Sequence, residues 1–168
     1  MFNSLRWGTS REEVVKSLKE KYPSLVEKKC DEYKYGTVKQ VICSYQSSSY
    51  GKLGTVGDMD VDSITVWYIC EEGTFDYYMF AAEYKCESLS PYKAMAEMLE
   101  YKYGHPYSHH TENSEVYGST FDIDKFTWTN EDMSQKVSIT RQNNAMDFGI
   151  LFGKSSITYD RSVEIYYG

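Results

Sequence analysis

A well-marked helix start lies close to the beginning of the chain, directly after a short apolar segment. Ser10 and Glu13 form an S-x-x-E capping box, in which the hydroxyl accepts a backbone N–H of the first turn and the carboxylate accepts the N–H of the serine. Apolar residues then recur at helical spacing until Pro23 ends the pattern. The sequence therefore predicts an amphipathic helix that begins at Arg11.

A second amphipathic helix is predicted over Pro91–Tyr103. Ser90 is a favourable N-cap residue, proline suits the first helical position, and Gly104 suits the end of the helix. The apolar side chains fall on one face, so this helix is also expected to lie on a sheet. That face consists of Tyr92, Met95, Ala96, Leu99 and Tyr103.

Strands are predicted in much of the remaining chain. Ser63–Cys70 and Asp76–Cys86 read as a hairpin, because both are rich in β-branched and aromatic residues and a turn with Gly73 separates them. The stretch from Gln46 to Asp62 is rich in Ser, Gly and Asp and reads as an exposed loop. Further strands are predicted at Val38–Tyr45, Lys125–Asn130, Gln135–Arg141, Phe148–Phe152, Ser156–Tyr159 and Val163–Tyr167, with a turn at Asn143-Asn144.

These elements together predict an α+β fold, with two amphipathic helices packed on one face of an antiparallel sheet. The 168 residues are expected to form a single domain, 1–168, because no linker or low-complexity segment divides the chain. A short sequence similarity between the ends of the two helices supports a further interpretation. In that interpretation the chain consists of two α-β-β-β halves, residues 1–88 and 89–168.

Charge and hydropathy exclude several classes of partner. The net charge is −7 and no basic cluster occurs, whereas nucleic-acid binding depends on Lys and Arg that neutralise phosphates. No apolar run approaches the ~20 residues that a membrane-spanning helix needs. The first residues also lack the apolar region of a signal peptide. We therefore expect no nucleic-acid partner and no membrane span in this chain.

The four cysteines show no C-x-x-C spacing, which argues against a structural zinc site. If they are oxidised, three pairings are possible. The predicted hairpin places Cys70 and Cys86 too far apart along the strands for a bridge. Cys30–Cys43, which closes a short loop, is then the preferred disulfide. Reduced, buried thiols remain the alternative.

No specific catalytic or ligand motif occurs. His105, His109 and His110 fit no zinc motif and are interpreted as part of a solvated loop. A D-x-D-x-D run that begins at Asp58 lacks the glycine and glutamate that would continue an EF-hand. The chain also lacks G-x-S-x-G, G-x-G-x-x-G and P-loop patterns. We therefore predict no catalytic residue, no metal and no cofactor.

The chain is rich in aromatic residues, with 17 Tyr, 7 Phe and 3 Trp. Tyrosine suits interfaces because its ring buries apolar area while its hydroxyl stays hydrated. Strict strand alternation would place Tyr78 and Tyr84 on one face and Tyr77 on the other. The alternative is that most of these rings belong to the core and its rim. The candidate binding residues are Trp67, Tyr68, Tyr77, Tyr78, Tyr84 and Trp128.

The pattern F-x-x-[IL]-x-[FW]-G-x-[ST]-x-x-[EQ]-V, which runs from Phe2 to Val14, resembles the start of certain bacterial envelope domains. These are the small outer-membrane assembly lipoproteins and the β-lactamase inhibitory protein. The order helix, Cys30, strand, Cys43 follows the same families more loosely. The resemblance implies a helical segment packed on an antiparallel sheet and a role in binding other proteins.

The expected function is a non-enzymatic, protein-binding module of the bacterial cell envelope, which uses the sheet face that the helices leave uncovered. Its location would then be extracytoplasmic: periplasmic, surface-exposed or secreted. Two alternatives stay open. One is a small-ligand or carbohydrate-binding domain with an aromatic cleft, and the other is a cytoplasmic interaction or immunity protein.

Overall fold

The computed structural model describes residues 5–57, 59–71, 73–74, 76–86, 92–116, 119–131, 135–146 and 151–161. Within them, two helices and ten strands follow one another along the chain. In order they are α1 (Arg11–Lys21), β1 (Leu25–Tyr35), β2 (Val38–Ser47), β3 (Gly54–Val56), β4 (Met59–Val61), β5 (Ser63–Glu71), β6 (Tyr78–Cys86), α2 (Tyr92–Tyr103), β7 (Ser108–Val116), β8 (Ser119–Thr129), β9 (Gln135–Met146) and β10 (Leu151–Arg161).

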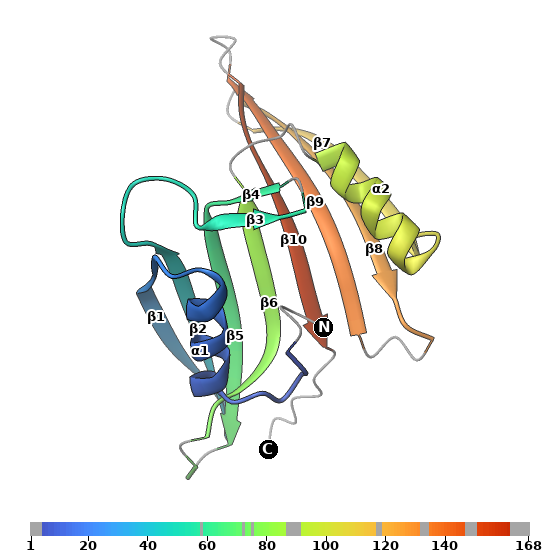
Figure 1. Ribbon diagram of the computed structural model, residues 1–168. Helices are drawn as coiled ribbons and strands as arrows, with labels where there is room; N and C mark the ends of the chain where they lie inside the picture. The colour runs from blue at the N-terminus through green and yellow to red at the C-terminus, as the bar shows by residue number, and fades with distance from the viewer. Residues whose placement is uncertain are drawn as a thin grey trace.

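Eight strands form one antiparallel sheet in the order β1-β2-β5-β6-β10-β9-β8-β7 (Figure 1). Each helix is followed by four strands of this sheet that run up and down as neighbours. The two four-stranded groups meet where β6 pairs with β10, from Ala81 opposite Asp160 to Cys86 opposite Ser155. Each helix is thus followed by four strands of the sheet, whereas the predicted α-β-β-β halves had three.

The predicted α+β class was wrong, because the protein is mostly β: strands account for 57% of it. The prediction that both helices pack as a layer on one face of the sheet was also wrong, because neither packs closely along a sheet face. Both approach the sheet from the same side but lie apart, each in front of one four-stranded group: α1 contacts β6, α2 contacts β9, and the β3–β4 hairpin lies between them (Figure 1). Capping and periodicity made the helices conspicuous in the sequence, whereas two polar edge strands carried no such signal.

The two faces of the sheet differ in burial. One face, here called the inner face, carries a row of buried side chains in register across the strands. Tyr45 lies opposite Ile64, and Ile64 lies opposite Tyr84. The helices and the hairpin approach the sheet from this side, while the opposite face, here called the open face, carries the alternate residues of each strand.

The N-terminal helix forms as predicted. Ser10 Oγ accepts the N–H of Glu13, the glutamate carboxylate accepts the N–H of Ser10, and the helix begins at Arg11. Its buried residues are Val14 and Leu18. The cap of the second helix, Ser90 and Pro91, lies outside the described residues, but its end does not. Gly104 follows the last helical residue with a φ of 79°, a conformation that favours glycine.

The β3–β4 hairpin contacts residues at both helices. Gly54 of β3 lies against the ring of Tyr22, so closely that a side chain at position 54 would collide with it. Gly57, with a φ of 56°, lies against the sulfur of Met95 in α2. This hairpin lies within the segment Gln46–Asp62 that was predicted to be a loop, and its two strands have only three residues each, too few to show an alternating pattern in the sequence.

Several other predictions were wrong at the level of single elements. The charged strand Leu25–Tyr35 was not predicted, and the histidine-rich segment after α2, which was predicted to be a loop, is mostly in β7. Asn143 and Asn144 lie within β9 and do not form a turn. The predicted strand Val163–Tyr167 lies outside the described residues, as do most of Phe148–Phe152 and Asp58. Neither described helix is long and apolar enough to cross a lipid bilayer.

Candidate functional site

The structure separates the six candidate binding residues into two groups. Tyr68, Tyr84 and Trp128 are at most 3% exposed and point to the inner face. Tyr68 and Tyr84 pack in the hydrophobic core with α1 residues, and Trp128 is part of the same core. These three rings are therefore core residues and are not available to a partner.

Trp67 and Tyr78 lie on the open face, together with residues that the sequence did not single out. Ile42 of β2 lies directly opposite Trp67 of β5. In the adjacent row, Tyr33 lies opposite Gln40, Gln40 opposite Ile69, and Ile69 opposite Tyr78. Directly paired residues share a face of the sheet. We call the resulting cluster the open-face patch, which consists of Tyr33, Ile42, Trp67, Ile69 and Tyr78.

The open-face patch is accessible to solvent. Tyr33 is 42% exposed and Tyr78 is 43% exposed, and the three residues between them are partly exposed. Clustered exposed apolar side chains often mark interaction sites, and Tyr and Trp are enriched at the energetic centres of protein interfaces. The patch thus has the composition of a protein-binding surface.

A shift of register explains why Tyr78 is in the patch while Tyr84 is not. Strict alternation would place them on one face, but the β5–β6 ladder is irregular between Trp67 and Tyr68. Tyr68 pairs with Met79, and Trp67 pairs with Ala81, so Phe80 is an extra residue on β6. A bulge of this kind reverses the face on which later residues lie.

Ion pairs within single strands border the open-face patch. Lys29 Nζ lies 2.7 Å from Asp31 Oδ2, and Asp31 is opposite Ile42. On the other side, Lys85 Nζ lies 3.3 Å from Glu83 Oε2. Because each pair is neutral overall, the patch has a polar rim without a strong charge of either sign. This arrangement matches the polar rim that surrounds the apolar centre of many interfaces.

Tyr77 is on the side of α1, apart from the open-face patch. Its hydroxyl donates a hydrogen bond to Glu32 Oε2 over 3.3 Å. Burial, followed by the nearby carboxylate of Glu32, raises the pKa of Tyr77. The residue thus has a partner within the chain and contributes nothing to the open face.

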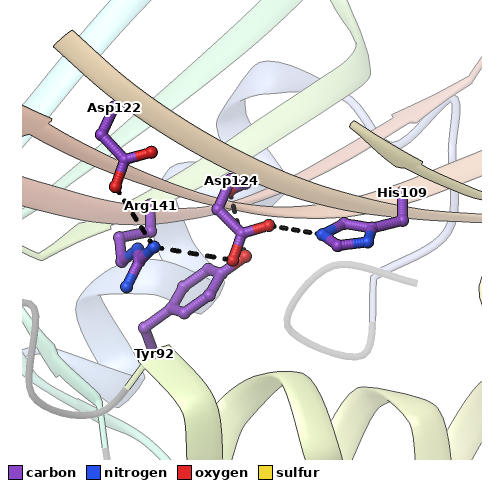
Figure 2. Close-up of polar contacts among 5 residues, drawn as sticks. All are labelled: Tyr92, His109, Asp122, Asp124 and Arg141. Atoms are coloured by element: carbon purple, nitrogen blue, oxygen red, sulfur yellow. Dashed lines mark hydrogen bonds and ion pairs between the residues drawn. The ribbon is translucent and has the colours of Figure 1, made fainter. Parts of the chain in front are cut away.

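A second constellation lies on the inner face beneath α2 (Figure 2). Asp124 of β8 lies at its centre, with Oδ1 2.6 Å from His109 Nε2 and Oδ2 3.8 Å from Arg141 Nη2. The hydroxyl of Tyr92 donates to the backbone oxygen of Asp124 over 3.0 Å. Arg141 also approaches Asp122, at 3.5 Å. Burial and the proximity of Asp124 raise the pKa of Tyr92.

Beside this cluster is a cavity of about 340 Å³ between α2 and strands β8 and β9. Its lining combines aromatic rings with charged side chains, but the lining residues include no Ser, Thr or Cys that could act as a nucleophile. Asp124 is already engaged with His109 and Arg141, which orient it as a structural group. The lining residues are Tyr92, Lys93, Ala96, Glu97, Glu100, Asp124, Phe126, Trp128 and Arg141.

Cys30 and Cys43 are joined in a disulfide, and they are direct partners in the β1–β2 ladder. Glu27 lies close to both sulfur atoms and forms an ion pair of 2.9 Å with Arg11. With both sulfurs in the disulfide and Arg11 beside the carboxylate, this group is a poor cation site. Cys70 and Cys86 are buried and are not disulfide-bonded.

Comparison of the chain with protein-family models, with curated proteins and with solved structures finds no match. The resemblance to bacterial envelope domains therefore stays a prediction that depends on the N-terminal pattern.

Proposed function

We propose that the protein is a non-enzymatic binding module that holds another protein against the open face of its sheet. The observation that carries this proposal is the open-face patch, in which Trp67 lies opposite Ile42 and the exposed ring of Tyr78 lies opposite Ile69 in the adjacent row. An aromatic cluster with a neutral polar rim suits a protein surface better than a highly charged ligand. The helices and the hairpin lie on the opposite side, so a partner can approach the patch directly.

An extracytoplasmic location belongs to the same proposal. The Cys30–Cys43 disulfide supports it, because structural disulfides persist in oxidising compartments and are rare in the cytosol. The resemblance of the N-terminal pattern to envelope domains points in the same direction. A free-thiol count on the denatured, non-reduced protein from its native host tests this part: two thiols support it, and four favour the cytoplasmic alternative.

The binding proposal is tested by affinity capture with matched variants. The wild-type protein, the double variant Trp67→Ala/Tyr78→Ala and the control Tyr101→Ala are immobilised and exposed to extracellular and envelope fractions. Tyr101 is a suitable control because it is 94% exposed on α2. Loss of two central aromatic side chains is expected to weaken binding by ~2 kcal/mol or more, roughly 30-fold in Kd.

The proteins that decide the test are those captured both by the wild type and by the Tyr101→Ala control. If the double variant loses such a protein while its circular dichroism spectrum is unchanged, the open-face patch is the binding site. If all three proteins retain the same partners with the same affinity, the patch does not bind them and the proposal fails.

A second candidate function is the binding of a small ligand in the cavity beneath α2. Its volume is at the lower end of the range of small-molecule sites, roughly 300 Å³ and upwards, and Phe126 and Trp128 provide aromatic walls. Titration of the variant Trp7→Phe/Trp67→Phe, whose one remaining tryptophan is Trp128, with mono- and disaccharides tests it through fluorescence. A saturable change that Phe126→Ala abolishes would support this function, and a flat response to every sugar would argue against it.

A further inference from the structure

The two outer edges of the eight-stranded sheet differ in their protection against pairing. β1 forms one edge and β7 forms the other. β1 carries the features that natural edge strands use to prevent further pairing: a register shift between Glu27 and Lys29, and several lysines, including Lys28 and Lys34. An additional strand would meet both obstacles at this edge.

β7 shows neither form of protection. Its nine residues pair with β8 in unbroken register from Ser108 opposite Thr127 to Val116 opposite Ser119. The strand has the sequence SHHTENSEV, with no lysine and no proline. The residues from His109 to Asn113 are all exposed. A long, regular and accessible edge of this kind is a template for another strand.

The polar side chains of β7 are arranged so that the strand complements itself. Its two histidines lie near the beginning, and its two glutamates lie towards the end. An antiparallel copy centred on Thr111 would place His110 opposite Glu112 of the partner subunit. The same contact would occur twice, because a two-fold axis relates the strands. Within one chain His110 Nε2 already lies 3.7 Å from Glu112 Oε2, so both groups are on one face of the strand.

The geometry points to a symmetric dimer in which β7 pairs with β7 of a second copy and the sheet continues across both subunits. Backbone hydrogen bonds along the strand would supply much of the stabilisation, and the alternating His110 and Glu112 side chains would fix the register. Tyr107, which is 67% exposed directly before β7, would lie at the border of the contact. This inference is independent of the open-face patch, which lies on strands of the other half of the sheet.

The first test is a disulfide trap at the two-fold axis. In the proposed register Thr111 faces Thr111 of the partner subunit, and directly opposed residues in antiparallel strands have Cα atoms roughly 4.5–5.5 Å apart. This separation suits a disulfide. Thr111→Cys is therefore expected to form a covalent dimer under mild oxidation, while the control Thr37→Cys, in the exposed β1–β2 turn, remains mostly monomeric.

The second test measures the dimer without a cross-link, by sedimentation velocity over a concentration series. Glu112→Lys should raise the dissociation constant by about tenfold or more, because it replaces the carboxylate that faces His110 of the partner subunit with an amine that cannot accept its hydrogen bond. The double charge swap His110→Glu/Glu112→Lys should restore association. The control Glu20→Lys, an equal change of charge on α1, should leave the wild-type value unchanged.

Each outcome decides the question. A trapped Thr111→Cys dimer together with rescue by the charge swap establishes the β7 interface. A wild-type protein that stays monomeric at its highest soluble concentration and gives no trapped dimer overturns it. A dimer that responds equally to Glu112→Lys and Glu20→Lys also overturns it, because the contact then lies elsewhere. The result of the capture experiment on Trp67 and Tyr78 does not depend on any of these outcomes.

Discussion

Trp128 donates a hydrogen bond from its indole Nε1 to the backbone oxygen of Gly104, over a distance of 2.8 Å. Gly104 directly follows α2, so the bond joins the end of this helix to strand β8. The indole is only 3% exposed, and its ring lies in the hydrophobic core. A single side chain thus satisfies a carbonyl at the end of the helix, fills part of the core and fixes the distance between two elements.

We expect Trp128→Phe to lower the free energy of unfolding by ~2 kcal/mol. The change removes one hydrogen bond, worth about 1 kcal/mol, and part of a buried ring. Trp67→Phe is the matched control, since Trp67 is partly exposed on the open face and is expected to cost less than about 1 kcal/mol. Urea titration monitored by far-UV circular dichroism provides both values. Equal losses in the two variants would contradict the anchoring role of Trp128.

Alkaline pH should destabilise the protein through two buried tyrosines. The hydroxyls of Tyr45 and Tyr68 lie 3.2 Å apart in the core, and burial raises the pKa of each above its ordinary value of 10.0. Below that pH both are protonated in the folded and unfolded states. Above it the unfolded chain releases protons that the folded protein retains, so stability falls as pH rises.

Urea titrations at several pH values from about 9 to 11 measure this slope. The double variant Tyr45→Phe/Tyr68→Phe should show a shallower decline than the wild type, whatever its stability at neutral pH. Tyr101→Phe, at a position 94% exposed, should keep the wild-type slope. A decline that is identical in all three proteins would mean that these two hydroxyls do not govern it.

The capping box of α1 should be measurable by substitution. Ser10→Ala removes the side chain that accepts the N–H of Glu13 and is expected to cost ~1 kcal/mol in unfolding free energy. Glu13→Gln should cost less, because the amide oxygen of glutamine can accept the same backbone N–H of Ser10. If chemical denaturation shows that Glu13→Gln lowers the free energy of unfolding more than Ser10→Ala does, the carboxylate has a role beyond capping.

The Cys30–Cys43 disulfide should stabilise the protein by about 3 kcal/mol, since it closes a loop with a sequence separation of 13 residues. Reductant should lower the Tm of the wild type but leave that of Cys30→Ser/Cys43→Ser unchanged. A reductant effect of equal size in both proteins would mean that the Cys30–Cys43 bridge does not cause it. Since Cys43 directly follows Ile42 of the open-face patch in β2, loss of the bridge should also weaken binding at this patch.

The sequence predicted the helices better than the sheet, for a physical reason. A capped helix is a local structure, so Ser10 and Glu13 mark its start without reference to the rest of the chain. An edge strand pairs on one side only and has charged, exposed residues, so Leu25–Tyr35 resembles a loop when it is read alone. The mostly β class became evident only when long-range pairing was known.

The sequence named some residues of the candidate site. The spacing of two cysteines could have identified a further one. Trp67 and Tyr78 were candidates, but Tyr33, Ile42 and Ile69 were not. A bridge between Cys30 and Cys43 as direct cross-strand partners fixes the register of β1 on β2, and that register places Tyr33 opposite Gln40. The bulge at Phe80 had no comparable signal, so alternation alone could not separate Tyr78 from Tyr84.

The pairing of β6 with β10 has a consequence for how the chain folds. Each group of four strands closes through contacts between sequence neighbours, whereas Ala81 must find Asp160 far along the chain. Local closure is the faster process, because its entropic cost is smaller. Both groups would then exist briefly with the joining edges of β6 and β10 uncovered. At high concentration each edge can be captured by the complementary edge of another molecule, so refolding yield should fall with concentration through exchange of whole strand groups between chains.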